Sequence, residues 1–554
     1  MARPQSSFRC ALCHVDAPIQ PIDVSGQSCG FSGGPPCPAC SELKNVDDKI
    51  HDTVVILQKL LEKQNVLKDK RNQYHDRLTN HLPLELVVRM FGFAIKQLPF
   101  YGYKASMSFQ HHQIHMWDSC GHTPWTLSTV CKTWKDIIWA TPQLWTSVSI
   151  NTAYIPTEYM TFAKEWLRRS GRLPINLTLY EGCWNDRNYI GEEASVVKAL
   201  FDIVNASSPR WRSLAVSVSD RHLKYLSGDP GGISRLEDLH FEQYPGFRNE
   251  IRETSIFCPH SKPSPQRVFA ERVHFKSIGI VWDHVTQVEL SSCPPVDCLK
   301  VLCHAPQTTH LTLGYLDDDN PQVAAPTTEP LLYKQLQFLK IRSTCKTIGF
   351  LFDSLTLPSL RELYISGHLS QAAALVARSG CPVTHLHLEE QFTHQLDPEH
   401  HLLDLLEHLP SVTELVLEKP HLSDTFFDRL GPYGLIEGDP ELLPGLRSLK
   451  ISRCAVSFQW QSVARMFERD PEAPEVWPRR ALRSLEVTEL EDMRRGDYYG
   501  SERSDSWYVE QRRRRLESLQ IPEEVVRSLL EIHENGVEMR ITDDRRNDLL
   551  PLWY

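Results

Sequence analysis

The residues best suited to chemistry in this chain are four cysteines near its beginning. Cys10 and Cys13 form one Cys-x-x-Cys pair, and Cys37 and Cys40 form a second. Two such pairs could supply the four thiolates of a tetrahedral structural zinc. Their separation exceeds the roughly 15 to 20 residues typical of that pattern, and the stretch between them is rich in Gly, Ser and Pro. Segment 1–41 is therefore interpreted either as a zinc ribbon or as disordered chain, and no other cofactor is indicated.

Motifs that would indicate catalysis are not found in the sequence. There is no Walker-type phosphate loop, no dinucleotide fingerprint and no Gly-x-Ser-x-Gly elbow, and no nucleophile and base are arranged with sequence support. We therefore expect a protein that binds partners rather than an enzyme.

Composition narrows the class of partner. The chain has 554 residues, 41% hydrophobic and 23% charged, with a net charge of −10. The acidity disfavours nucleic acid as the main partner, since phosphate binding relies on clustered Lys and Arg. No apolar run reaches the roughly 18 residues of a membrane helix, and no signal peptide is apparent. Fifteen scattered cysteines then indicate reduced thiols, and the expected compartment is cytosol or nucleus.

Segment 42–80 is charged and has the periodicity of a long helix. Apolar residues recur at two heptad positions, which are occupied by Ile50, Leu57 and Leu78 and by Leu60, Leu67 and Tyr74. This spacing predicts either a short coiled coil, which could make a homodimer, or a helix that packs back on the helices after it.

Segment 171–545 contains repeats of the form apolar-x-x-apolar-x-apolar, such as Leu360 to Ile365. The central apolar residues at 288, 311, 339, 363, 386 and 415 are separated by 23, 28, 24, 23 and 29 residues, which matches the period of leucine-rich repeats. Roughly ten to twelve repeats fit, including weaker ones such as that around Val273. Residues 546–554 form a tail.

Helical patterns between the strands, such as Gln371 to Arg378, predict an α/β solenoid with parallel strands inside and a crossover helix outside in each repeat. Strand residues between the apolar positions would face the concave side. The candidates for substrate binding there are His240, Glu289, His310, Lys340, Arg342, Tyr364, His385 and His387. This acidic, histidine-rich set with few aromatics favours a protein or peptide ligand.

Segment 81–150 carries an ordered set of short motifs, with an insert at 96–123. Leu82-Pro83-Leu84-Glu85-Leu86 opens an amphipathic helix, because Pro83 suits the first turn and Glu85 lies near the positive end of the helix dipole. Val130-Cys131-Lys132-Thr133-Trp134 starts a second helix, and Thr141-Pro142-Gln143-Leu144-Trp145 ends it.

In this order the motifs resemble an F-box, and the whole chain resembles the F-box and leucine-rich-repeat proteins abundant in mushroom-forming fungi. The resemblance implies a substrate receptor of an SCF-type ubiquitin ligase, which docks on a Skp-type adaptor and through it on a cullin. The residues it implies at or beneath the adaptor interface are Leu82, Pro83, Leu86, Val130, Cys131, Trp134, Leu144 and Trp145. The alternative is a scaffold that dimerises through segment 42–80 and acts without ubiquitin transfer.

Overall fold

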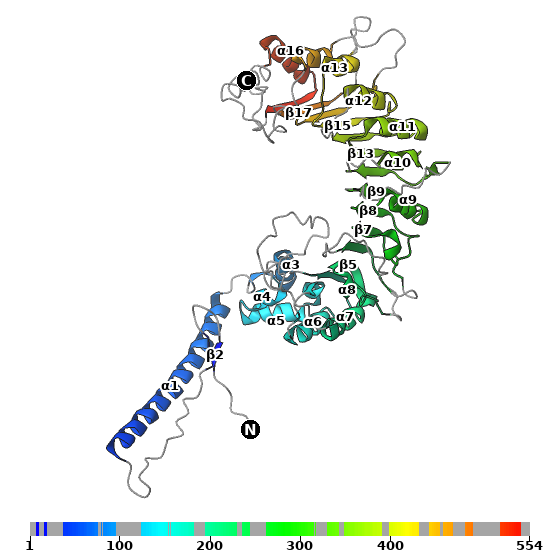
Figure 1. Ribbon diagram of the computed structural model, residues 1–554. Coiled ribbons are helices and arrows are strands. Elements are labelled where there is room, and N and C mark those ends of the chain that lie inside the picture. The colour runs from blue at the N-terminus through cyan, green and yellow to red at the C-terminus, as the bar shows by residue number, and fades with distance from the viewer. Residues whose placement is uncertain are drawn as a thin grey trace, which may run out of the picture. The chain divides into compact units, whose positions relative to one another are not determined.

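The computed structural model describes residues 7–9, 16–18, 37–75, 79, 81–95, 123–152, 155, 157–181, 194–229, 235–243, 257, 262–314, 316, 329–342, 348–389, 398–431, 442–454, 458–468, 482–490 and 521–543. The chain divides into two compact units, and Figure 1 labels their helices and strands. The first comprises Met1–Lys96 and His122–Thr141, and the second comprises Gln97–Gly121 and Pro142–Tyr554.

The first unit is mainly helical. Strands β1 (Ser7–Arg9) and β2 (Asp16–Pro18) form an antiparallel pair. Helix α1 (Pro38–His75) spans 38 residues, so the predicted long helix is present. Among the described helices, none combines the length and the apolar character needed to cross a membrane.

Among its described residues the first unit also has three shorter helices, namely α3 (Leu84–Ala94), α4 (Pro124–Ser128) and α5 (Lys132–Ala140). Each begins at a residue suited to the role. Pro83 is the N-cap of α3, Thr123 forms a capping box with Thr126 at α4, and the Cys131 thiol accepts a hydrogen bond from the Trp134 N–H at α5. The Thr123 and Cys131 side chains thereby satisfy backbone N–H groups that have no partner inside the helix, whereas Pro83 makes no side-chain cap hydrogen bond.

The second unit contains one long parallel sheet. Among the described residues it has fourteen strands, which follow one another in chain order with β10 and β12 left out. The strands are β3 (Ser147–Asn151), β4 (Ile175–Tyr180), β5 (Trp211–Val218), β6 (Asp238–Gln243), β7 (Arg267–Glu271), β8 (Gln287–Ser291), β9 (His310–Leu313), β11 (Phe338–Ile341), β13 (Glu362–Ser366), β14 (His385–Glu389), β15 (Glu414–Glu418), β16 (Ser448–Ser452), β17 (Ser484–Leu490) and β18 (Glu538–Asp543). Strands β10 (Leu331–Leu332) and β12 (Leu355–Thr356) pair separately.

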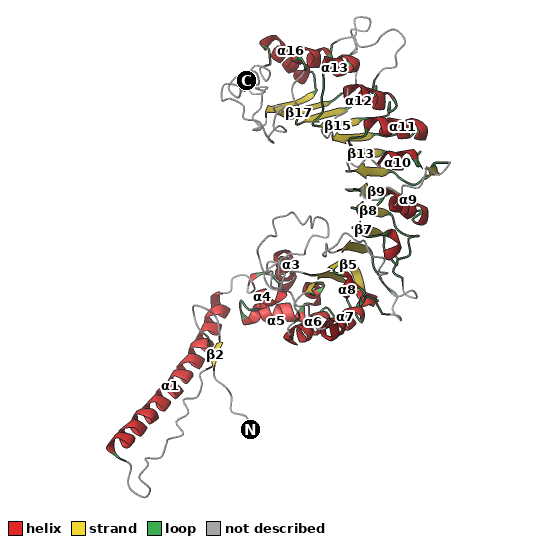
Figure 2. Ribbon diagram, viewed as in Figure 1, coloured by secondary structure: helices red, strands yellow, loops and turns green. Residues whose placement is uncertain are grey.

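Helices cover one side of this sheet (Figure 2). They are α6 (Thr157–Arg169), α7 (Ala194–Asn205), α8 (Asp220–Leu223), α9 (Pro295–His304), α10 (Ile348–Asp353), α11 (Leu369–Ser379), α12 (Pro398–Glu407), α13 (Asp424–Leu430), α14 (Trp460–Arg465) and α16 (Glu523–Glu534), with 3₁₀ helices η1 (Pro142–Trp145), η2 (Ser208–Arg210) and η3 (Phe275–Ser277). Within the unit the sheet curves, with strands on the inner side and helices on the outer side (Figure 2). The solenoid-like α/β fold predicted from the repeats is therefore present.

The core of the second unit is built from matching repeat positions. Leu311, Leu339, Leu363 and Leu386 are register partners in consecutive strands, and their side chains are almost fully buried. Burying one leucine stabilises the fold by about 1.5–3 kcal/mol. Because each leucine packs mainly on its neighbours in the array, stability is shared along the chain rather than held in one centre.

The structure differs from the sequence prediction at three points. The sheet begins at β3, before residue 171, where the array was expected to start. The weak repeat expected around Val273 has its strand earlier, at Arg267–Glu271. The connection from β7 to β8 contains only the 3₁₀ helix η3, whereas an α-helix was expected in every repeat. The short spacing there leaves too few residues for a full crossover helix.

Candidate interaction surfaces

Helix α3 exposes a line of large apolar side chains. Leu86, Met90 and Phe93 are 46%, 42% and 76% exposed, and their spacing of four and then three residues places them on one face of the helix. We call these three residues the α3 stripe. Leu82 and Leu84 are also exposed at the beginning of the helix. Contiguous exposed apolar side chains mark interaction sites more often than isolated ones do.

The opposite face of α3 forms the core of the helical module. Val87 and Phe91 are buried, and the Phe91 ring lies 4.7 Å from the ring of Trp134 on α5. Leu127 and Ile138 are buried in the same unit. Helix α3 therefore has two apolar faces, and the one formed by the α3 stripe is not needed for the core.

The first six predicted adaptor residues divide into two groups. Leu82, Pro83, Leu86 and Val130 are exposed, so they are available to a partner. The other two, Cys131 and Trp134, are half-buried and have structural roles, since Cys131 caps α5 with a sulfur–nitrogen distance of 3.4 Å and Trp134 packs on Phe91.

The last two predicted adaptor residues, Leu144 and Trp145, belong to the second unit and are buried. The Trp145 ring lies 5.4 Å from the Trp166 ring on α6, and the Trp166 indole N–H donates to the Trp145 carbonyl at 3.0 Å. The Arg169 guanidinium lies 5.3 Å from the centre of the Trp145 ring. The Pro-x-Leu-Trp segment is thus part of the core at the first repeat, and its tryptophan is not free to contact an adaptor.

The eight predicted substrate-binding residues share the inner face of the second unit. One row of register partners, which runs across the sheet from β6 to β14, contains five of them. These are His240, Glu289, Lys340, Tyr364 and His387. His310 and His385 lie in an adjacent row, and Arg342 follows β11. The alternation of side chains along each strand turns all of them away from the buried leucines.

This face carries a continuous run of rings that the sequence prediction did not anticipate. The His310, Phe338, Tyr364 and His387 rings, on β9, β11, β13 and β14, are separated in turn by 5.4, 5.2 and 5.2 Å. We call these four residues the aromatic ladder. The Lys340 ammonium lies 5.4 Å from the Tyr364 ring centre. Aromatic pairs at these distances contribute about 0.5–1.5 kcal/mol each beyond the area they bury.

Acidic residues flank the ladder on its C-terminal side. His385 lies 3.5 Å from Glu414, and His387 lies 3.4 Å from Glu418. Burial lowers the pKa of His387 and outweighs the opposing effect of Glu418. The His387 ring is therefore neutral at pH 7, and its contact with Glu418 is polar rather than an ion pair. The aromatic ladder is thus flanked by a basic residue, Lys340, and by two acidic residues, Glu414 and Glu418.

A second pair of rings and a pair of carboxylates lie on β6 and β7. The His240 and Phe269 rings stack at 3.9 Å, and burial lowers the pKa of His240 to about 4. Glu242 is the register partner of Glu271. Burial, with repulsion from Glu271, raises the pKa of Glu242 to about 7. At this point the inner face therefore holds a neutral imidazole and a carboxyl group that is partly protonated near neutral pH.

Phe269 and Phe338 are the inner-face residues that the sequence prediction missed. Each directly follows or precedes buried apolar residues of its strand, so each resembles a core position in the sequence. The signal that could have identified them is the two-residue alternation, since Phe269 follows Val268 and Phe338 precedes Leu339, both of which are buried.

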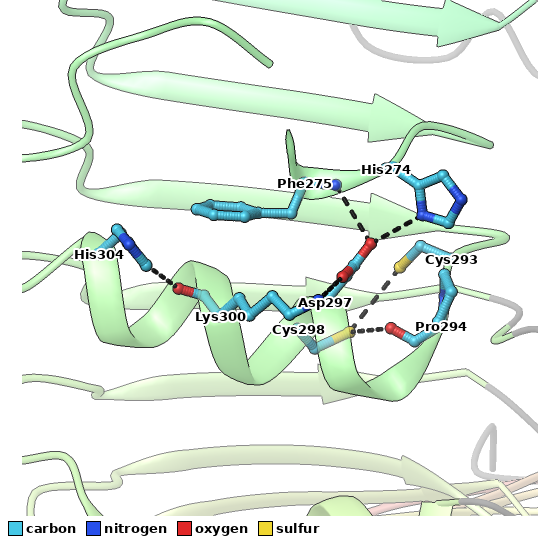
Figure 3. A network of polar contacts seen from close by, with 8 residues as sticks. All are labelled: His274, Phe275, Cys293, Pro294, Asp297, Cys298, Lys300 and His304. Atoms are coloured by element: carbon cyan, nitrogen blue, oxygen red, sulfur yellow. Dashed lines mark hydrogen bonds and ion pairs between the residues drawn. The ribbon is translucent and has the colours of Figure 1, made fainter. Parts of the chain in front are cut away.

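A polar network fixes α9 against the loop after β7 (Figure 3). The Asp297 carboxylate accepts hydrogen bonds from the Phe275 N–H at 3.2 Å and from Lys300 at 2.8 Å, and it lies 3.1 Å from His274 Nδ1. Burial opposes ionisation of Asp297, but these partners prevail and its pKa is lowered. Beside them the buried thiols of Cys293 and Cys298 lie 3.8 Å apart (Figure 3). The network joins neighbouring repeats on the helical side.

The zinc prediction is only partly within the described residues. Cys37 and Cys40 lie at the beginning of α1, where the Cys40 N–H lies 3.5 Å from the Cys37 sulfur, whereas Cys10 and Cys13 are outside the described residues. In the part of the chain that the structure describes, no three His, Cys, Asp or Glu side chains gather in a way that could hold a metal ion. The zinc site stays a prediction.

No protein-family model matches this chain, and no curated protein matches it in sequence.

Proposed function

We propose that this chain is the substrate receptor of an SCF-type ubiquitin ligase. In this proposal the helical module is an F-box that docks on a Skp-type adaptor and thereby on a cullin, and the repeats are leucine-rich repeats that bind a protein substrate. The chain itself would transfer no ubiquitin, and it would act in the cytosol or the nucleus.

The observation that carries the proposal is the exposed apolar surface of the helical module, which comprises the α3 stripe and the exposed residues just before it, such as Leu82. The residues that the resemblance places at an adaptor interface include Leu82, Pro83 and Leu86, and these side chains are exposed although two of them are large and apolar. The module has a separate core around Phe91 and Trp134. An apolar face that costs hydration and is not used for folding is best explained by a partner that covers it.

The aromatic ladder supports a protein substrate on the inner face. Rings flanked by Lys340, Arg342 and carboxylates offer apolar contact area together with polar specificity, which is the composition of protein-binding sites. A Phe338→Ala/Tyr364→Ala variant should keep its adaptor but lose the proteins that become ubiquitinated with the intact receptor in its own cells. Ubiquitination of the same proteins by this variant would place substrate binding elsewhere.

Assembly tests the proposal as a whole. The purified chain, mixed with a Skp-type adaptor and a cullin–RING pair, should elute as one complex in size-exclusion chromatography. A matched sample without the adaptor should leave the chain and the cullin in separate peaks. Separate peaks with the adaptor present would contradict the proposal.

A second candidate is a ubiquitin-independent scaffold. It is favoured by helix α1, whose apolar residues Leu43, Ile50 and Leu60 are among several that are exposed along its length. A scaffold would self-associate through α1 and bind a partner through its repeats with no need of an adaptor. The assembly experiment distinguishes the two functions, because only the receptor forms a complex with the adaptor.

A further inference from the structure

Helix α1 presents a complete heptad seam. Seam positions a and d fall every three and four residues, and all of these side chains are exposed in the chain. They are Leu43, Val46, Ile50, Thr53, Leu57, Leu60, Gln64, Leu67, Arg71 and Tyr74. We call them the α1 seam. A helix with such a seam is stabilised when a second helix covers it, because an isolated helix gains little from propensity alone.

Charge along α1 is divided between its halves. The first half, residues 38–56, has four acidic and two basic residues and a net charge of −2, whereas residues 57–75 have two acidic and five basic residues and a net charge of +3. Two copies side by side in the same direction would place like charges together. Two copies in opposite directions would place each acidic half against a basic half.

The seam itself distinguishes the two directions. In a parallel pair, identical residues meet in each layer, so Arg71 would face Arg71 of the second copy. In an antiparallel pair that uses the whole seam, each seam residue of one copy meets a seam residue of the other copy, and the two residue numbers add to 117. Ile50 then faces Leu67, Leu57 faces Leu60, and Thr53 faces Gln64, so the polar residues share a layer and Arg71 meets Val46.

The flanking positions give the same result. In a parallel pair Glu42 would lie beside Asp47, and Lys63 would lie beside Lys68, which are two repulsive contacts on each side. In the antiparallel pair Asp47 lies beside Lys68 of the other copy. Lys49 and Lys70 then come together as the one repulsive contact at these flanks, so attraction and repulsion are better balanced than in the parallel pair.

We propose that α1 binds α1 of a second copy of this chain in an antiparallel coiled coil. The partner is a second copy because the acidic half of α1, residues 38–56, and its basic half, residues 57–75, complement each other under a twofold axis, as a symmetric interface requires. The 38 residues of α1 make a pair about 57 Å long. The C-terminal ends of the two helices, where the chain continues toward α3, are then at opposite ends of the pair. Two helical modules could bind partners at once without collision.

Self-association of the full chain is the first measurement. Sedimentation equilibrium should give twice the 63.7 kDa of one chain. Leu60→Asp should dissociate the pair because it places a charge in a central layer. Val66→Asp is the matched control, since Val66 is about as exposed as Leu60 (54% against 58%) but lies off the seam. Two results would overturn the proposal. One is a monomer at all concentrations. The other is equal dissociation of both variants while near-UV circular dichroism shows that the array is folded.

Charge reversal then tests the direction. Asp47→Lys should weaken the antiparallel pair about five-fold, since two attractive contacts with Lys68 become repulsive. The double variant Asp47→Lys/Lys68→Asp should restore the affinity. In a parallel pair Asp47→Lys would instead strengthen association by attracting Glu42. Asp48→Lys is the control of equal charge at an outward position and should change little. Tighter association of Asp47→Lys than of the unmodified chain would refute the antiparallel direction.

Discussion

The ring of Trp134 lies 4.7 Å from the ring of Phe91 at an interplanar angle of 56°, and this contact separates the core of the helical module from its exposed surface. Phe91 and Val87 face Trp134 and the core, whereas Leu86 and Met90 of the same helix are exposed. One short helix thus serves two purposes. Substitutions on its two faces should therefore have different effects.

Trp134→Ala should destabilise the module. Because the ring is half-buried and packs on Phe91, the expected loss in the free energy of unfolding is about 2–3 kcal/mol. Hydrogen exchange of the α3 and α5 amides would measure it, since these helices belong to a different compact unit from the array and exchange reports the opening of each region separately. The exposed neighbour provides the control, and Val130→Ala should leave exchange in both helices unchanged.

Trp145→Ala should loosen the beginning of the array rather than the helical module. Trp145 is fully buried and contacts Trp166 and Arg169, so its truncation should cost about 3–5 kcal/mol. Faster hydrogen exchange in β3, β4 and α6, with protection unchanged in α3 and α5, is the expected result. Gln143→Ala, an exposed site in the same 3₁₀ helix, should have no effect. Faster exchange in α3 with an intact β3 would reverse the assignment of Trp145 to the array.

Glu242→Gln should stabilise the array at neutral and alkaline pH but not in acid. Burial, with repulsion from Glu271, raises the pKa of Glu242 from an ordinary 4.5 to about 7. Ionising a carboxyl group whose pKa is raised on folding destabilises the folded chain. Stability is therefore lost as pH rises from about 4.5, the ordinary pKa, to about 7, the pKa of Glu242 in the folded chain. Removing the ionisation should recover about 2 kcal/mol at pH 8, since solvent screening at the half-buried Glu242 reduces the roughly 3 kcal/mol that the full pKa shift would give.

Thermal unfolding at two pH values measures this effect. The apparent Tm of Glu242→Gln should exceed that of the unmodified chain by a few degrees at pH 8 and should be close to it at pH 4, below both pKa values. Glu538→Gln removes an exposed carboxylate on β18 and should change neither value. A gain for Glu242→Gln that is equal at both pH values would show that the cause is packing rather than ionisation.

The architecture of the second unit could be predicted because every repeat carries the same local pattern. Leu363 and Leu386, separated by one period, become register partners in adjacent strands, and the period alone indicates that. The β7–β8 connection departs from this pattern, because only residues 272–286 separate the two strands and a full crossover helix does not fit there.

The candidate surfaces were predictable only in part. The inner-face residues from His240 to His387 follow from strand alternation, whereas Phe338 was missed because an apolar residue beside Leu339 resembles the core. The prediction that Trp145 lies at or beneath an adaptor interface rests on the resemblance of its Pro-x-Leu-Trp motif to part of an F-box. Trp145 is buried against Trp166, which is 21 residues away in the sequence. The local sequence around Trp145 does not reveal a contact with a residue so far along the chain.

The most direct test of the central claim is the affinity of the purified chain for a Skp-type adaptor, measured by isothermal titration calorimetry. Leu86→Asp should weaken binding at least 100-fold, because it places a charge in the α3 stripe, and an unpaired charge in an apolar interface costs several kcal/mol. Leu332→Asp is the matched control, since Leu332 is a similarly exposed leucine (53%) in the second unit, and it should bind like the unmodified chain. Equal affinities of the two variants, or no binding by the unmodified chain, would contradict the account.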